Sequence, residues 1–135
     1  MNYYIASGLE NFRRVGLAAQ ALSRHTRTYD WTAHGDIRRE GPERMRRVSS
    51  TELEAVIAAE LVFVLLPGGK GTHTELGAAL ATGQHKRIIL WSETGDEFRV
   101  EEGQVHSSVC AFYFHPCAER WVCPFEELLE RLRAL

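Results

Sequence analysis

A glycine-rich segment followed by a glutamate is the part of this sequence best suited to chemistry. Residues 67–72 follow an apolar run, residues 61–66, and precede a helical pattern that contains Glu75. Glycines let the backbone approach a ligand closely, and the free N–H groups at a helix N-terminus favour an anion. The segment therefore predicts a loop that binds a phosphate or an anionic sugar, with the Glu75 carboxylate beside it.

The same residues also fit a purely structural role. The segment is not a Walker phosphate loop, because it lacks the Gly-Lys-Ser/Thr ending at the required spacing. Thr72 and Glu75 have the spacing of a capping box, in which Glu75 would only close the helix start. Ser49 and Glu52 repeat that spacing upstream. Structural and catalytic interpretations therefore stand side by side for both glutamates.

The motifs resemble those of one enzyme superfamily. Residues 52–91 are similar to the nucleoside 2-deoxyribosyltransferase superfamily, most closely its small 2'-deoxynucleoside 5'-phosphate N-hydrolases. Their Gly-rich turn follows the third strand, and the next helix begins Gly-x-x-x-Glu-x-Gly, matched here by residues 71–77. Residues 3–8 resemble the family's first strand and substrate-binding turn. Residues 67–75 also resemble the Pro-Gly-Gly-x-Gly-Thr-x-x-Glu motif of Lonely Guy-type phosphoribohydrolases, which also cut a base from a nucleoside monophosphate.

The resemblance implies an N-glycosidase that hydrolyses (deoxy)nucleoside 5'-monophosphates with Glu75 as the nucleophile. A carboxylate beside C1' stabilises an oxocarbenium-like transition state or forms a covalent intermediate, and a second group protonates the leaving base. Glu52 matches the position of the family's acid and is the first candidate for proton donor, ahead of Asp30 and His34. Tyr3 is a candidate for positioning Glu75 by a hydrogen bond.

The remaining candidate residues are expected to hold the sugar phosphate. In the small hydrolases a serine of the neighbouring subunit also reaches the phosphate, and either of two serines here lies at about the matching place. The resemblance therefore implies a homodimer with a shared active site. The expected substrate-binding residues are Ser7, Gly8, Gly68, Gly69, Gly71, Thr72, Ser107 and Ser108.

Two other functions fit the same residues. A deoxyribosyltransferase would move the sugar to a second base. Gly69 stands where such transferases usually carry an aspartate, six residues before the nucleophile, which favours the hydrolase. A non-catalytic nucleotide sensor on the same fold would bind nucleotide without turnover.

The elements around these residues predict an α/β fold, a single doubly wound, Rossmann- or flavodoxin-like sheet of five mostly parallel strands flanked by helices. Continuous apolar runs indicate strands covered on both faces. Strands are expected at 3–6, 61–66, 87–91 and 111–114, with a weaker one at 27–31, and helices at 12–23, 50–59, 72–82 and 125–135. Ligands bind such sheets at the carboxyl ends of the strands, where the Gly-rich segment lies.

Length and composition narrow the class of protein. A chain of 135 residues suits one domain, here 1–135, and the net charge of -2 gives no reason to expect nucleic acid or a membrane as partner. The first residues lack the basic and apolar segments of a signal peptide, so we expect none. Three cysteines without metal-site spacing suggest free thiols in a reducing compartment, the cytoplasm. We expect a small-molecule nucleotide or nucleoside as substrate, with no cofactor and no metal.

Overall fold

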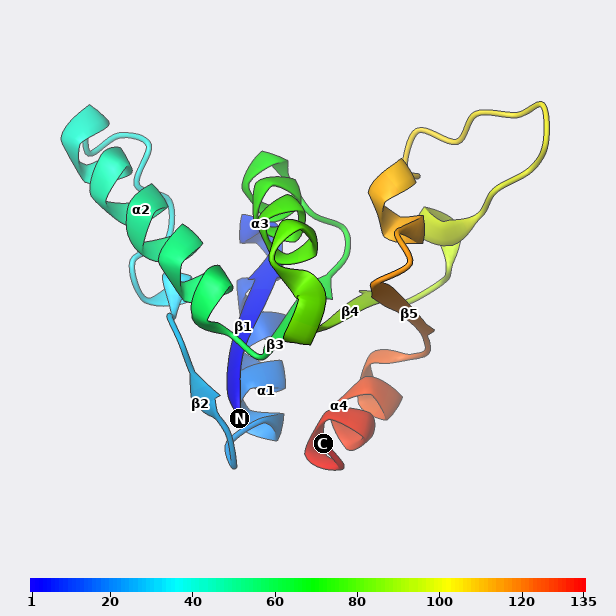
Figure 1. Ribbon diagram of the computed structural model, residues 1–135, viewed down its shortest axis with the longest axis horizontal. Helices are drawn as coiled ribbons and strands as arrows, with labels where there is room; N and C mark the ends of the chain where they lie inside the picture. The colour runs from blue at the N-terminus through cyan, green and yellow to red at the C-terminus, as the bar shows by residue number, and fades with distance from the viewer.

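The sheet contains five parallel strands, as a computed structural model describing residues 1–135 shows (Figure 1). The strands lie in the order β2-β1-β3-β4-β5, and every pairing is parallel. The chain changes direction across the sheet between β1 and β3, so their carboxyl ends form the switch point where such sheets bind ligands. The bounds are β1 (Asn2–Ser7), β2 (Thr26–Arg27), β3 (Leu61–Leu65), β4 (Arg87–Ser92) and β5 (Ala118–Val122). The predicted doubly wound α/β fold is confirmed.

Four α-helices cover the two faces of this sheet. They are α1 (Phe12–Ala21), α2 (Pro42–Ala58), α3 (Lys70–Ala81) and α4 (Phe125–Arg133). Helix α2 packs on α3, and α1 packs on α4 (Figure 1). Right-handed crossovers on either side of the switch point place α1 on one face and α2 and α3 on the other. None of the helices combines the length and apolar composition needed to cross a membrane.

The core lies on both sides of the central strands. Every residue of β3 is fully buried, as are Ile88 to Trp91 of β4. This double coverage explains why both strands read as continuous apolar runs rather than alternating ones.

The strand expected at 111–114 is wrong, because Ala111–Phe114 is a short 3-10 helix and the fifth strand is β5. Strand β5 lies at the edge of the sheet, with Glu119 and Arg120 exposed. On β4, Arg87 pairs with Glu119 at 2.9 Å between Nε and Oε1. Charged side chains break the apolar run that marks the central strands, so hydrophobicity pointed to the wrong segment.

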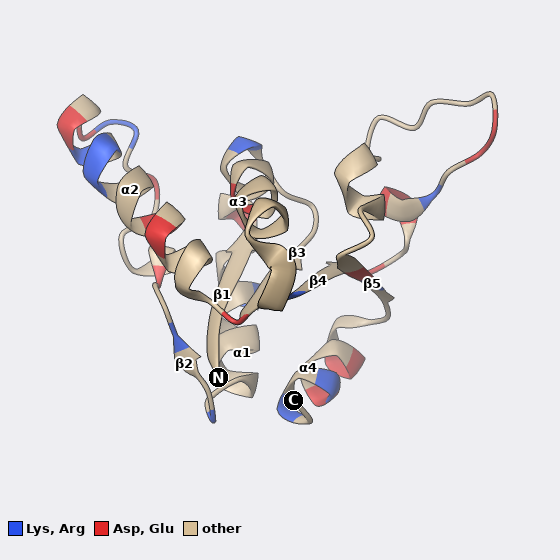
Figure 2. Cartoon of the chain, viewed as in Figure 1, with Lys and Arg blue, Asp and Glu red and all other residues tan.

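Helix α2 begins eight residues before the expected start at 50. Gly41, with φ 93°, precedes Pro42 at the first helical position, where a missing N–H costs no hydrogen bond. Charges of both signs gather on the first turns of α2 (Figure 2). These charges obscured the amphipathic pattern from which a helix start at 50 was predicted.

The weak strand expected at 27–31 contains only the end of β2, which is Thr26–Arg27. Trp31 lies instead in a 3-10 turn, Trp31–Ala33, and its Nε1 donates to the Ile5 carbonyl at 2.8 Å. Trp31 is 5% exposed. Trp31 therefore packs the loop after β2 onto β1.

Candidate active site

The Gly-rich segment forms a tight turn between β3 and α3. Gly69 lies at the N-cap of α3, and its N–H donates to Thr72 Oγ1 at 3.1 Å. A Cβ added at Gly68 would lie 2.4 Å from Thr72 Cγ2, closer than any side chain tolerates. The turn therefore requires glycine at 68. Thr72 occupies the capping role that the sequence pattern offered to Glu75.

Polar side chains tie this turn to the end of β1. Ser7 Oγ donates to the Leu65 carbonyl at 2.8 Å and accepts from Asn11 Nδ2 at 3.0 Å. Asn11 Nδ2 also contacts the Pro67 carbonyl at 3.2 Å. The hydroxyl hydrogen of Ser7 is thus used within the protein. Ser7 and Asn11 hold the turn in place, while Gly8 lies beside them at the end of β1.

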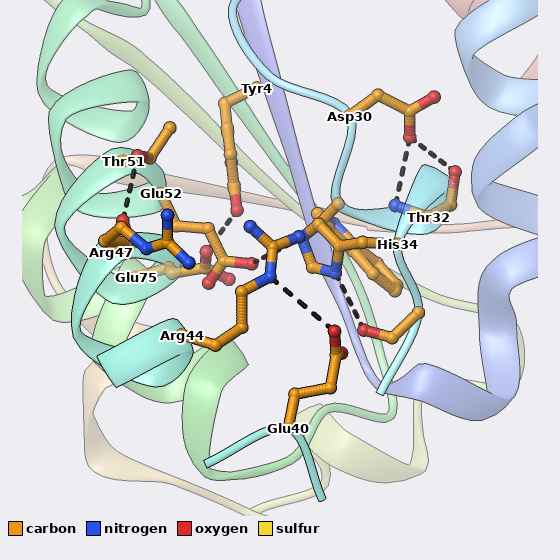
Figure 3. Close-up of polar contacts among 12 residues, drawn as sticks. Tyr4, Asp30, Thr32, His34, Glu40, Arg44, Arg47, Thr51, Glu52 and Glu75 are labelled. Atoms are coloured by element: carbon orange, nitrogen blue, oxygen red, sulfur yellow. Dashed lines mark hydrogen bonds and ion pairs between the residues drawn. The ribbon is translucent and has the colours of Figure 1, made fainter. Parts of the chain in front are cut away.

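Glu75 extends from the second turn of α3 toward the sheet. The residue is 8% exposed, and its Oε2 accepts a short hydrogen bond from the Tyr4 hydroxyl of β1 (Figure 3). Burial raises the pKa of Glu75 to about 8, although the Tyr4 hydrogen bond lowers it, and the nearby Glu52 raises it further. A buried carboxyl with a perturbed pKa and a dedicated hydrogen-bond donor is typical of a functional site rather than of a helix cap.

The expectation that Tyr3 positions Glu75 is wrong, because Tyr4 does. Neighbouring strand residues point to opposite faces of the sheet. Tyr4 faces α3, whereas Tyr3 faces α1 and its hydroxyl lies 3.4 Å from the Ala19 carbonyl. The sequence offered two adjacent tyrosines, and only the face of the sheet on which each lies decides between them.

Glu52 lies within α2 and faces the same site (Figure 3). The capping box suggested by Ser49 and Glu52 does not form, because α2 already begins at Pro42 and Ser49 Oγ contacts the Arg46 carbonyl at 3.0 Å. Burial raises the pKa of Glu52, and the neighbouring His34 lowers it. The structure therefore brings Glu52 and Glu75 together from two different helices.

Asp30 and His34, the weaker candidates for the acid, make different contacts in the structure. The Asp30 carboxylate pairs with Arg27 at 2.9 Å and accepts from the Thr32 N–H at 3.0 Å. These contacts stabilise the loop. His34 instead approaches Glu52, with 3.8 Å between Nε2 and Oε1.

Ser107 and Ser108 lie apart from the two glutamates. They line a cavity of about 200 Å³ beside Gly68, together with His73 and Tyr113. Neither Glu75 nor Glu52 lines this cavity. Within one chain, these serines therefore reach the Gly-rich turn from the side of β4 and β5.

A histidine and a tyrosine brace the start of α3 beside this cavity. His73 Nδ1 lies 2.7 Å from the Gly69 carbonyl, and Nε2 lies 2.7 Å from the Tyr113 hydroxyl. Burial raises the pKa of Tyr113 to about 12. The loop of residues 99–110 projects away from the sheet above this region (Figure 1).

No group of three or more His, Cys, Asp or Glu side chains is arranged to hold a metal ion. Sequence reasoning missed Tyr4 and Asn11. The sequence placed Tyr3 and Tyr4 on opposite faces of one strand but did not show which face meets α3, and nothing in it distinguished Asn11 from other polar loop residues.

The comparisons with known proteins concern the fold. No protein-family model matches the chain, and no curated protein matches it by sequence. The CMP N-glycosidase BcmB of Clostridium botulinum has a similar structure, with a TM-score of 0.65 at 16% identity over 98% of both chains. A conserved protein from Enterococcus faecalis matches with a TM-score of 0.59 at 20% identity, covering 99% of this chain and 98% of that one. These likenesses establish a shared α/β architecture.

Proposed function

We propose that this chain is an N-glycosidase that hydrolyses the base–sugar bond of (deoxy)nucleoside 5'-monophosphates, with Glu75 as nucleophile. The observation that carries the proposal is the buried Glu75 carboxyl, held by Tyr4 and faced by Glu52 at the switch point of the sheet. The fold shared with a CMP N-glycosidase supports it.

The geometry supports a double displacement. Glu75 Oε2 accepts from Tyr4, whereas Oε1 makes no hydrogen bond within the protein and is free to attack C1'. In the first step the Oε1–C1' bond forms, the C1'–N bond breaks, and the leaving base takes a proton from Glu52. In the second step water attacks C1' and returns a proton to Glu52, while the ester bond breaks and Glu75 regains its negative charge.

The Gly-rich turn is the proposed phosphate site. The N-terminus of α3 directs unpaired N–H groups to the same end of the sheet as the glutamates, and its dipole favours an anion there. Gly69, Gly71 and Thr72 lie on this first turn. The phosphate of the nucleotide would then be fixed by the turn that immediately precedes the nucleophile.

We extend the proposal to a homodimer in which Ser107 or Ser108 of one protomer completes the phosphate site of the other. Within their own chain both serines line the cavity beside Gly68, which Glu75 does not line, and they belong to the loop that projects from the sheet (Figure 1). The proposed shared site therefore lies on the other side of the turn, which faces Glu75. A neighbouring protomer could approach with this loop without displacing a strand.

The test is to incubate the protein with ribo- and deoxyribonucleoside 5'-monophosphates, CMP included, and to measure free base by chromatography. Wild type should release base from at least one nucleotide, Glu75→Gln should not, and Glu54→Gln, at an exposed glutamate of α2, should behave as wild type. Release of base by Glu75→Gln at the wild-type rate would contradict the assignment of the nucleophile. A product that forms only when a second base is added would identify a transferase instead. Nucleotide binding without any product would favour a sensor.

A further inference from the structure

His34 has an imidazole whose tautomer is set by its surroundings. Nδ1 lies 2.8 Å from the Gly35 carbonyl, which can only accept a hydrogen bond. Nδ1 must therefore carry a hydrogen, and in the neutral ring Nε2 is left with a lone pair.

The Nε2 atom is buried without a hydrogen-bond partner. The nearest carboxylate oxygen is Oε1 of Glu52 at 3.8 Å, and the two side chains are 15% and 26% exposed (Figure 3). This separation is too long for a hydrogen bond but short enough for one to form by rotation of the Glu52 side chain. A buried nitrogen that lacks a partner is costly, so a proton shared with Glu52 would satisfy both groups.

We propose that His34 and Glu52 share one proton and act as a single acid, with Glu52 delivering that proton to the leaving base. His34 is then a positioning residue, because its buried Nε2 reaches the base only through Glu52. The inference rests on the proposed function and adds His34 as the residue that shares the catalytic proton with Glu52.

One proton leaves the His34–Glu52 pair and returns to it in each catalytic cycle. Before reaction the pair holds one proton, either on His34 beside a Glu52 carboxylate or on Glu52 beside a neutral imidazole. When the C1'–N bond breaks, its electron pair leaves with the base, and the proton passes from Glu52 to that base. When water attacks C1', the proton it releases returns to Glu52 and is again shared with His34.

Other charged groups around the pair set the pH range in which it works. Tyr4 and Glu75 face Glu52 from β1 and α3, and the Tyr29 ring lies 5.7 Å from His34. Arg44, two turns before Glu52 on α2, pairs with Glu40 at 3.8 Å between Nε and Oε1 (Figure 3). The Glu75 anion favours retention of the proton, whereas the Arg44–Glu40 ion pair carries little net charge.

The test compares two leaving groups in wild type and His34→Gln. One substrate is the nucleotide that wild type hydrolyses fastest, whose base needs a proton. The other is p-nitrophenyl β-riboside 5-phosphate or its 2-deoxy counterpart, whose phenolate leaves without one. His34→Gln should slow the nucleotide by about 10- to 100-fold and leave release of p-nitrophenolate near the wild-type rate.

Matched variants decide between a proton-sharing role and a structural one. Glu52→Gln should show the same selectivity, and the double variant should be no slower than Glu52→Gln alone, because residues that act as a unit are not additive. Glu75→Gln should hydrolyse neither substrate. If a folded His34→Gln hydrolysed both substrates more slowly by the same factor, or both at the wild-type rate, the inference would be overturned.

A measurement without turnover separates this inference from the proposed function. In ¹H–¹⁵N NMR of the His34 ring, wild type should show a hydrogen-bonded proton between Nε2 and Glu52, and Glu52→Gln, which has no proton to share, should lose that signal. Identical ring spectra of the two proteins would refute proton sharing. If wild type hydrolyses neither substrate, the proposed function fails, and the NMR spectra still decide whether His34 and Glu52 share a proton. The same spectra answer the question if His34→Gln does not fold.

Discussion

The Tyr4 hydroxyl donates a hydrogen bond to Oε2 of Glu75, which lies 71 positions later in the chain. This contact fixes one oxygen of the carboxyl and leaves the other free. It also links β1 to α3, the helix that follows the Gly-rich turn.

Tyr4→Phe should weaken catalysis and shift its pH dependence. The hydrogen bond lowers the pKa of Glu75, so its loss raises that pKa and moves the acid limb of kcat/KM to higher pH. A hydrogen bond to a charged group is worth about 1.5–3 kcal/mol, so kcat/KM should fall by roughly 10- to 100-fold. Tyr3→Phe is the matched control, because Tyr3 faces α1, and its pH profile should overlay that of wild type.

Glu75→Gln should stabilise the folded protein at alkaline pH. The folded-state pKa of Glu75, about 8, lies above the ordinary value of 4.5. The carboxyl therefore contributes stability that is fully present below the ordinary value and is lost as pH rises through 8. Glutamine keeps an oxygen for Tyr4 and does not ionise.

The measurement for this variant is the melting temperature as a function of pH. The difference between Glu75→Gln and wild type should grow in favour of the variant from pH 4.5 to pH 8. A difference that stays constant over this interval would mean that Glu75 titrates like an exposed carboxyl.

Gly68→Ala should destabilise the protein, whereas Gly77→Ala should not. The added methyl at 68 would overlap Thr72, and overpacking of this kind costs about 1–3 kcal/mol. Gly77 lies within α3 with open space around it, so alanine there should add up to about 1 kcal/mol. Chemical denaturation measures both values, and equal stabilities would show that the turn can rearrange.

The shared phosphate site predicts complementation between two inactive proteins. Glu75→Gln lacks the nucleophile, and a Ser107→Ala/Ser108→Ala double variant should bind phosphate poorly. In mixed dimers one of the two sites would contain Glu75 from one protomer and both serines from the other. Mixing should therefore restore activity, measured as release of base, whereas no recovery in a verified mixed dimer would assign both sites to single chains.

The sequence predicted the strands whose side chains are buried on both faces and failed where polar residues interrupt that pattern. Strand β3 and the turn before Glu75 follow directly from an apolar run and a cluster of glycines. Strand β5 was missed because Glu119 and Arg120 face solvent at the sheet edge. The start of α2 was missed because its first turns carry charges on most sides.

The sequence likewise predicted only part of the candidate site. Glu75 and Glu52 were recognised as candidates, and the structure brings them together. Tyr4 was not chosen over Tyr3, because that choice depends on which face of β1 meets α3. The approach of His34 to Glu52 depends on how the loop after β2 folds over α2, which no local pattern encodes.

The crossover between β1 and β3 divides the candidate site between two halves of the chain. Tyr4, His34 and Glu52 precede β3, whereas the Gly-rich turn and Glu75 follow it. Neither half holds the full set, and contacts between residues so distant in sequence form only after a large loop has closed. Enzymatic turnover would therefore report complete assembly of the sheet. It would serve as a readout of reassociation if the chain were split into two fragments just before Leu61.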